Sequence, residues 1–127
     1  MSRLDLETGD RKKILIGVVG PCGSGKSTLI TGLERQGYRC RHIAQEHSYV
    51  QNMWQVLTAP DLLIFLQSSY LSSTTRRKLN WSIEDFEEQQ RRLSHAYQHA
   101  HLIIETTDLS VGEVLARALE FIKEATQ

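Results

Sequence analysis

The residues of this sequence whose types and spacing could do chemistry begin with a glycine-rich segment from Gly20 to Ser27. The segment reads GPCGSGKS and matches the pattern G-x-x-x-x-G-K-S/T at every fixed position. Glycines let a backbone bend around a phosphate chain and point N–H groups at it, and a following helix adds its positive dipole end. In such a loop, Lys26 supplies positive charge to the terminal phosphates, and the hydroxyl group of Ser27 is the first ligand of Mg²⁺. The pattern therefore predicts a site for a nucleoside triphosphate with Mg²⁺.

Thr28 and Cys22 are two further members of this predicted loop. Thr28 follows Ser27 and could donate a hydrogen bond to an inner phosphate. Cys22 occupies a variable position, where a redox-sensing thiol or a small tolerated side chain would both fit, and we favour the second interpretation. We expect the nucleotide to contact the whole loop, namely Gly20, Pro21, Cys22, Gly23, Ser24, Gly25, Lys26, Ser27 and Thr28.

Two basic clusters could assist at a phosphate. Phosphoryl transfer needs positive charge around the transferring group, and a catalytic role for Arg76, Arg77 and Arg92 would supply it. Arg91 and Lys78 are weaker candidates for the same role. The alternative for both clusters is a solvated basic surface.

Several aromatic and histidine residues also allow two interpretations. Four apolar residues could either form a flat wall for a planar acceptor or pack in the core. We favour core packing for these residues, which are Tyr49, Met53, Trp54 and Tyr70. His95 and His99 are spaced for one face of a helix, which permits a pair of metal ligands. Because no third ligand accompanies them in the sequence, we predict that they form a polar helix face.

The loop requires a buried strand before it and a helix after it. Residues 12–19, KKILIGVV, form a continuous apolar run with β-branched residues, which is typical of a parallel strand buried on both faces. Residues 26–36 carry apolar side chains on one side of a helix, and Gly37 would end it. A glycine-rich turn without a ligand is the alternative for the loop, but this context favours phosphate binding.

The rest of the chain alternates strands and helices. We predict strands over 38–44, 61–67 and 101–105, a short helix within 48–58, and a long helix over 82–100. Capping boxes, Ser82 with Asp85 and Ser110 with Glu113, would begin the long helix and the closing helix. This alternation predicts an α/β fold with three layers, α/β/α, around a short parallel sheet of four to five strands. Residues 1–127 would form one domain, with 1–11 as a loose lead-in.

Glu46 is the acidic residue that this topology places best. If the sheet has only four strands, the strand over 38–44 lies beside the strand of the phosphate loop, and Glu46 follows its carboxyl end. Ligands of open α/β sheets bind at those carboxyl ends. Glu46 could therefore hold Mg²⁺ together with Ser27, or accept a proton from an acceptor. A plain surface glutamate is the alternative.

Composition limits the classes of partner. Of 127 residues, 40% are apolar, and fifteen basic residues balance fifteen acidic ones, so no overall charge would recruit nucleic acid or an anionic membrane. The charged N-terminus has no apolar core of a signal peptide, and the apolar runs are too short to cross a bilayer. Two cysteines, Cys22 and Cys40, fit reduced thiols, so we expect a cytoplasmic protein.

The loop and its context resemble the P-loop kinases of nucleosides, nucleotides and small metabolites, a superfamily with the P-loop NTPase fold. The resemblance extends from about Lys13 to the end, but only the loop is specific; PDLLIFLQSS and RRLSHAYQHAHLIIETTD resemble the family weakly. It implies lid arginines between the last two strands, and a glutamate such as Glu46 after an early strand. It also implies that Thr107 and Asp108 lie near adenine. The family has an Asp where this chain has Gln67.

The sequence thus predicts an ATP-binding protein that uses Mg²⁺, with transfer of the γ-phosphoryl group to a small hydroxyl or phosphate acceptor. The second hypothesis is a nucleotide-binding regulatory or accessory module with little or no turnover, which Gln67 and the short middle of the chain favour. A GTPase is disfavoured because the sequence has no N-K-x-D motif, and an ABC-type ATPase because it has no LSGGQ-like signature.

Overall fold

Four parallel strands form the sheet at the centre of the computed structural model, which describes residues 14–72 and 81–126. The strands are β1 (Leu15–Val19), β2 (Arg39–His42), β3 (Leu62–Gln67) and β4 (Leu102–Glu105). They lie in the order β2-β1-β3-β4. The predicted parallel α/β sheet is therefore confirmed with four strands, including the arginine-rich second strand, which is shorter than the predicted range.

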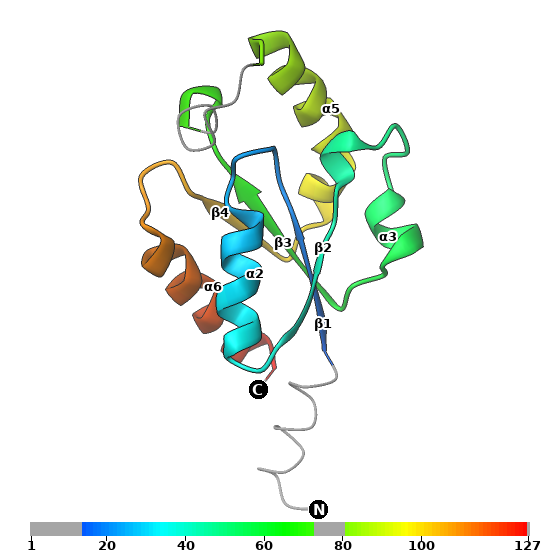
Figure 1. Cartoon of the computed structure of the whole chain (residues 1–127). Coiled ribbons are helices and arrows are strands. Elements are labelled where there is room, and N and C mark those ends of the chain that lie inside the picture. Colours follow the sequence, from blue (N-terminus) through cyan, green and yellow to red (C-terminus); the bar gives the residue numbers. More distant parts are fainter. Residues whose placement is uncertain (1–13, 73–80, 127) are drawn as a thin grey trace, which may run out of the picture.

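Helices cover both faces of this sheet (Figure 1). One face packs against α2 (Lys26–Arg35) and α6 (Val111–Ala125), and the other against α3 (Met53–Leu57) and α5 (Ile83–His99). Side chains of β3 alternate between the two cores, because successive residues of a strand point to opposite faces. Burial on both faces explains why β1 and β3 are continuous apolar runs. None of the helices in the described ranges combines the length and apolar character that crossing a bilayer requires.

The chain changes direction across the sheet between β1 and β3. From β1 the chain passes through α2 to β2 on one side, whereas β3 leads through α5 to β4 on the other. The two central strands pair in register, with Val19 opposite Phe65 at their carboxyl ends. Such a switch point is where open α/β sheets bind ligands, and here it lies directly beneath the glycine-rich loop.

The three long helices begin in two different ways. Both predicted capping boxes are confirmed: Ser82 caps α5 with Asp85, and Ser110 caps α6 with Glu113. Helix α2 instead begins after Gly25, which has φ 98° and provides no side-chain cap. The first N–H groups of a helix have no partner inside it, so those of α2 are available to a bound anion.

The capping box of α6 gives a prediction about pH. Hydrogen bonds from the backbone and then the side chain of Ser110 hold the pKa of Glu113 below its usual value. A lowered pKa in the folded state means that the stabilisation is present at neutral pH and is lost as the pH falls through that pKa. We expect Glu113→Ala to lower the melting temperature at pH 7 and to match the unmodified protein near pH 3. An equal decrease at both pH values in thermal unfolding would contradict the role of the charge.

Candidate functional site

The predicted phosphate-binding loop connects β1 to α2 at the switch point of the sheet. Gly20, Gly23 and Gly25 have φ angles of 156°, 82° and 98°, a region that residues with a Cβ atom rarely adopt. A Cβ atom at Gly20 would lie 2.4 Å from the carbonyl oxygen of Leu66 on the neighbouring strand. The glycines of the motif are therefore required by the path of the backbone.

Lys26 lies inside the loop and is almost completely buried, with 6% of its surface exposed. Its Nζ atom donates hydrogen bonds to the carbonyl oxygens of Gly20 at 2.7 Å and Pro21 at 3.1 Å. The third partner is Glu46, whose Oε2 atom lies 2.7 Å from Nζ. The two charged residues that the sequence predicted separately therefore form one buried ion pair.

Glu46 belongs to a single 3-10 turn, η1 (Gln45–His47), that follows β2. Only 2% of its surface is exposed, and its second oxygen, Oε1, accepts no hydrogen bond from any described residue. A buried carboxylate oxygen without a donor is energetically costly, so such an atom requires an explanation. A bound cation would provide one, since carboxylate oxygens are preferred ligands of Mg²⁺.

Gln45 holds the turn that carries Glu46, and sequence reasoning did not identify it. The side chain is fully buried. Its amide donates to the carbonyl oxygens of Val50 at 2.8 Å and Arg92 at 3.2 Å, and its oxygen accepts from the backbone N–H of Trp54 at 2.8 Å. This glutamine thus ties η1 to both α3 and α5, which fixes the position of the neighbouring glutamate.

Arg92 lies beside the same turn. Its guanidinium group donates to the carbonyl oxygen of Glu46 at 3.4 Å and to Glu88 at 3.2 Å, and it stacks 4.3 Å from the ring centre of Tyr49. Arg91 is more exposed and pairs with the same Glu88. The structure therefore brings Arg92 next to the candidate acid, and leaves Arg91 on the surface.

Four predicted core residues have different environments. Trp54 is buried and Met53 packs partly against the same core, as expected. Tyr49 is 83% exposed, so the core interpretation is wrong there, because its ring lies over a guanidinium group at the surface. The half-buried Tyr70 contacts Trp81 and Phe86 through their rings.

The two helix histidines lie on one face of α5, as predicted. Their rings stack with centroids 4.1 Å apart, and the indole N–H of Trp54 donates to Nδ1 of His95 at 3.1 Å. Among the described residues, no third ligand joins His95 and His99 in a group that could hold a metal ion. The polar helix face remains the better interpretation of the pair.

Two further points of the sequence analysis concern the predicted lid residues and the end of β3. The predicted lid residues Arg76 and Arg77, and Lys78 beside them, lie outside the described residues. Gln67 ends β3 beside the loop, where the resembled kinases have an Asp, and its Oε1 atom is buried without a donor among the described residues. Gln67 and Glu46 thus each place at the carboxyl edge of the sheet a buried side-chain oxygen that accepts no hydrogen bond from the residues in ranges 14–72 and 81–126.

Gln89 is a second residue that sequence reasoning missed. From α5, its amide oxygen accepts from the backbone N–H of Cys22 at 3.0 Å, and its nitrogen donates to the Sγ atom of Cys22 at 3.3 Å. The available signal was its position four residues before the buried Leu93, because a polar residue on the apolar side of a helix indicates an internal partner. Gln89 fixes the tip of the loop against α5.

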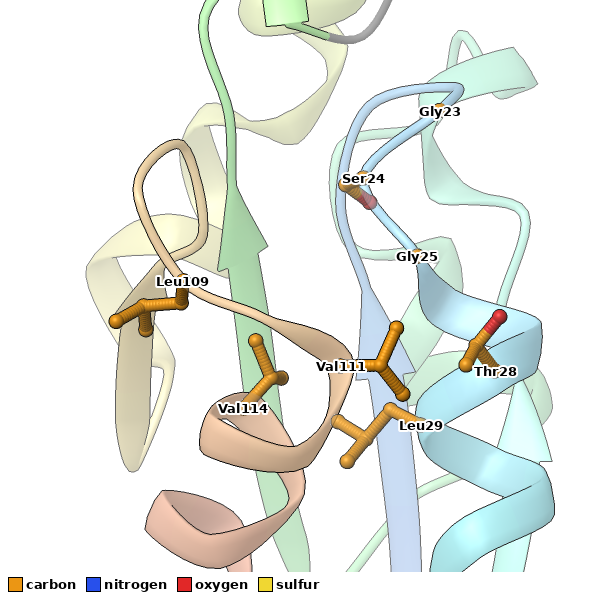
Figure 2. A pocket seen from close by; sticks show the side chains of 8 residues that line it. All are labelled: Gly23, Ser24, Gly25, Thr28, Leu29, Leu109, Val111 and Val114. Atoms are coloured by element: carbon orange, nitrogen blue, oxygen red, sulfur yellow. The ribbon is translucent and has the colours of Figure 1, made fainter. Parts of the chain in front are cut away.

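Two cavities adjoin the loop and share Gly23 and Gly25. The first, of about 230 Å³, lies between α2 and the start of α6, and in Figure 2 the side chain of Val111 points toward α2. The second cavity, of about 200 Å³, is lined mainly by charged and polar side chains. Its lining residues are Cys22, Gly23, Gly25, Lys26, Ser27, His42, Glu46 and His47. An apolar cavity and a polar one therefore lie beside a common stretch of backbone.

No protein-family model matches this sequence, and no curated protein matches it either. The function must therefore be inferred from the loop, the ion pair and the two cavities.

Proposed function

We propose that this protein has the P-loop NTPase fold, binds ATP with Mg²⁺, and transfers the γ-phosphoryl group to a small hydroxyl or phosphate acceptor. The observation that carries the proposal is the buried pair of Lys26 and Glu46, 2.7 Å apart, inside a complete G-x-x-x-x-G-K-S loop. Lys26, a cation that could bind phosphates, and Glu46, a carboxylate that could bind the metal, therefore lie side by side where the loop meets the carboxyl edge of the sheet.

The polar cavity fits the phosphate end of the nucleotide. Lys26 and the N–H groups at the uncapped start of α2 would hold the terminal phosphates. Ser27, whose side chain is exposed at that helix start, and Glu46, with its unpartnered Oε1, would hold Mg²⁺. When bound, Mg²⁺ would neutralise charge on the phosphate oxygens.

The apolar cavity fits the base end of the nucleotide. It lies against the same glycines, and its wall is formed by Leu29 of α2 together with Leu109, Val111 and Val114. Planar bases are held mainly by apolar contacts in such cavities. Thr107 and Asp108, which precede this wall, are exposed and would lie near the rim.

This placement of the base gives a prediction for Val111, which is 65% exposed in the structure. A carboxylate there would remove apolar contact and repel the phosphates, so we expect Val111→Glu to weaken ATP binding about tenfold or more with little change in stability. Val56, which is similarly exposed on α3 and lines neither cavity, provides the matched control Val56→Glu. Equal ATP affinity of the two variants, measured by calorimetry, would exclude this cavity as the base site.

The alternative proposal is a nucleotide-binding accessory module without phosphoryl transfer. Gln67 favours it, because a neutral amide replaces the acid that the resembled kinases carry at the end of this strand. A panel of small hydroxyl and phosphate acceptors separates the two proposals. A kinase should consume ATP faster with one acceptor, whereas an accessory module should show a nucleotide-dependent melting shift and no acceptor-stimulated turnover.

A further inference from the structure

Three side chains with metal-binding atoms meet beside the loop, and the proposed nucleotide function does not use all of them. They are Cys22 from the loop and Glu46 and His47 from the turn η1. Their ligand atoms all lie within 4.8 Å of one another, and all three residues line the polar cavity. Within the part of the chain that the structure describes, this is the one group of three such residues.

We propose that Cys22, Glu46 and His47 form a binding site for a thiophilic divalent cation, with Zn²⁺ as the best match, and with one coordination position open to water. The site needs no nucleotide, so it does not depend on the proposed function. Glu46 would serve Zn²⁺ when no nucleotide is present and Mg²⁺ when the nucleotide is bound.

The spacing of the ligand atoms matches tetrahedral zinc. With Zn–S of about 2.3 Å and Zn–N of about 2.0–2.1 Å, sulfur and nitrogen ligands stand about 3.6 Å apart. The Sγ atom of Cys22 lies 3.5 Å from Nε2 of His47. The Oε2 atom of Glu46 lies 3.9 Å from the same nitrogen, where about 3.4 Å is expected for two ligands at about 2.05 Å, so a small side-chain movement would complete the geometry.

The chemistry of the ligands selects zinc over magnesium. Thiolate and imidazole prefer Zn²⁺ and similar metals, whereas Mg²⁺ prefers oxygen ligands only. The thiolate of Cys22 and the carboxylate of Glu46 would supply two negative charges to the ion, and the carboxylate is shared with Lys26, whose Nζ atom lies 2.7 Å from Oε2. The buried Oε1 atom of Glu46, which has no donor among the described residues, is an independent sign that this carboxylate accepts a further positive partner.

The surroundings support the proposed ligands and give access to them. Gln89 donates to the sulfur of Cys22 and accepts from its backbone N–H, which are the contacts that orient a ligand from outside the coordination sphere. The side chain of His47 is 59% exposed, so a cation can reach the cavity from solvent on that side.

Titration of the protein with Co²⁺ alone, monitored by absorbance, tests the site without any nucleotide. Co²⁺ replaces Zn²⁺ in tetrahedral sites and reports a sulfur ligand through a charge-transfer band. We expect one equivalent of Co²⁺ to produce this band and one equivalent of Zn²⁺ to remove it. The absence of the band would overturn the proposal and leave the proposed nucleotide function unaffected.

Two variants test two of the proposed ligands, and a third variant is the control. Removing even an outer partner of a metal ligand commonly costs 10–100-fold in affinity, so Cys22→Ser should eliminate the band and weaken Co²⁺ binding at least about tenfold. His47→Asn, at a largely exposed side chain, should cause a similar loss with the fold intact. Cys40→Ala is the control: burial raises the pKa of the Cys40 thiol to about 12, so this thiol is not available as a thiolate. A band that survives in Cys22→Ser, or disappears in Cys40→Ala, would refute the assignment.

Discussion

Replacing Lys26 with methionine is expected to lower the free energy of unfolding by about 3–5 kcal/mol, because it leaves the carboxylate of Glu46 buried without its partner. The side chains of the pair are only 6% and 3% exposed, so water cannot take over the lost interaction. The double variant Lys26→Met with Glu46→Gln removes both charges and should recover most of this loss. Urea unfolding of the four proteins in the cycle measures the coupling.

Lys123 provides the matched control for this prediction. It lies on the exposed side of α6 near its end, and Lys123→Met should change the stability by less than about 0.5 kcal/mol. If Lys26→Met is as stable as this control, or if the double variant is no more stable than Lys26→Met, the buried ion pair does not contribute as we describe.

Replacing Glu46 with glutamine is expected to lower the rate of phosphoryl transfer by about 10²–10⁴-fold, the usual effect of removing a catalytic acid or base. The amide retains the shape of the side chain and an oxygen for Lys26, so the loop and ATP binding in the absence of Mg²⁺ should persist. The charge that would hold Mg²⁺, or take the acceptor's proton, is lost. Turnover with an acceptor identified from the panel, together with ATP affinity with and without Mg²⁺, measures both parts of this prediction.

Glu34→Gln is the control for the second prediction, since Glu34 is an exposed acid on α2. Its turnover should equal that of the unmodified protein. Full activity of Glu46→Gln would exclude Glu46 from the reaction and make Gln67 the next residue to test, since its side-chain oxygen at this edge is also buried without a donor among the described residues.

The parallel sheet could be predicted because its two central strands are buried on both faces. This burial makes β1 and β3 continuous apolar runs, and each is bounded by residues that end a strand. The weaker β2 was predictable from its place after the glycine that ends α2, although only Cys40 of its four residues is buried. Of the strand order, the sequence predicted only that the strand over 38–44 lies beside β1, and the structure gives the complete order β2-β1-β3-β4.

The position of Glu46 could be predicted from topology, but its pairing with Lys26 could not. The two residues are separated by twenty positions, and no local pattern relates them. The pair forms because β2 returns beside β1 and its following turn closes over the loop. That closure depends on the buried amide of Gln45, which has no recognisable signal in the sequence.

The environment of Tyr49 was mispredicted for a similar reason. An aromatic residue near an apolar segment usually packs in a core, but the turn after β2 directs this ring outward against Arg92 of α5. The contact between two distant elements decides whether the ring is buried. The position of Arg92 on the long helix could be predicted from periodicity, whereas its contact with the carbonyl oxygen of Glu46 could not.

Calorimetric titration with ATP and Mg²⁺ tests the central claim most directly, with the unmodified protein compared with the double variant Lys26→Met with Glu46→Gln. The double variant keeps a neutral, folded interior, so a difference in binding reports the site and not a loss of the fold. We predict one binding site in the unmodified protein with a dissociation constant in the micromolar range, and binding at least about a hundredfold weaker in the double variant. No binding by the unmodified protein at millimolar ATP, or equal affinity of the two proteins, would contradict the proposed function.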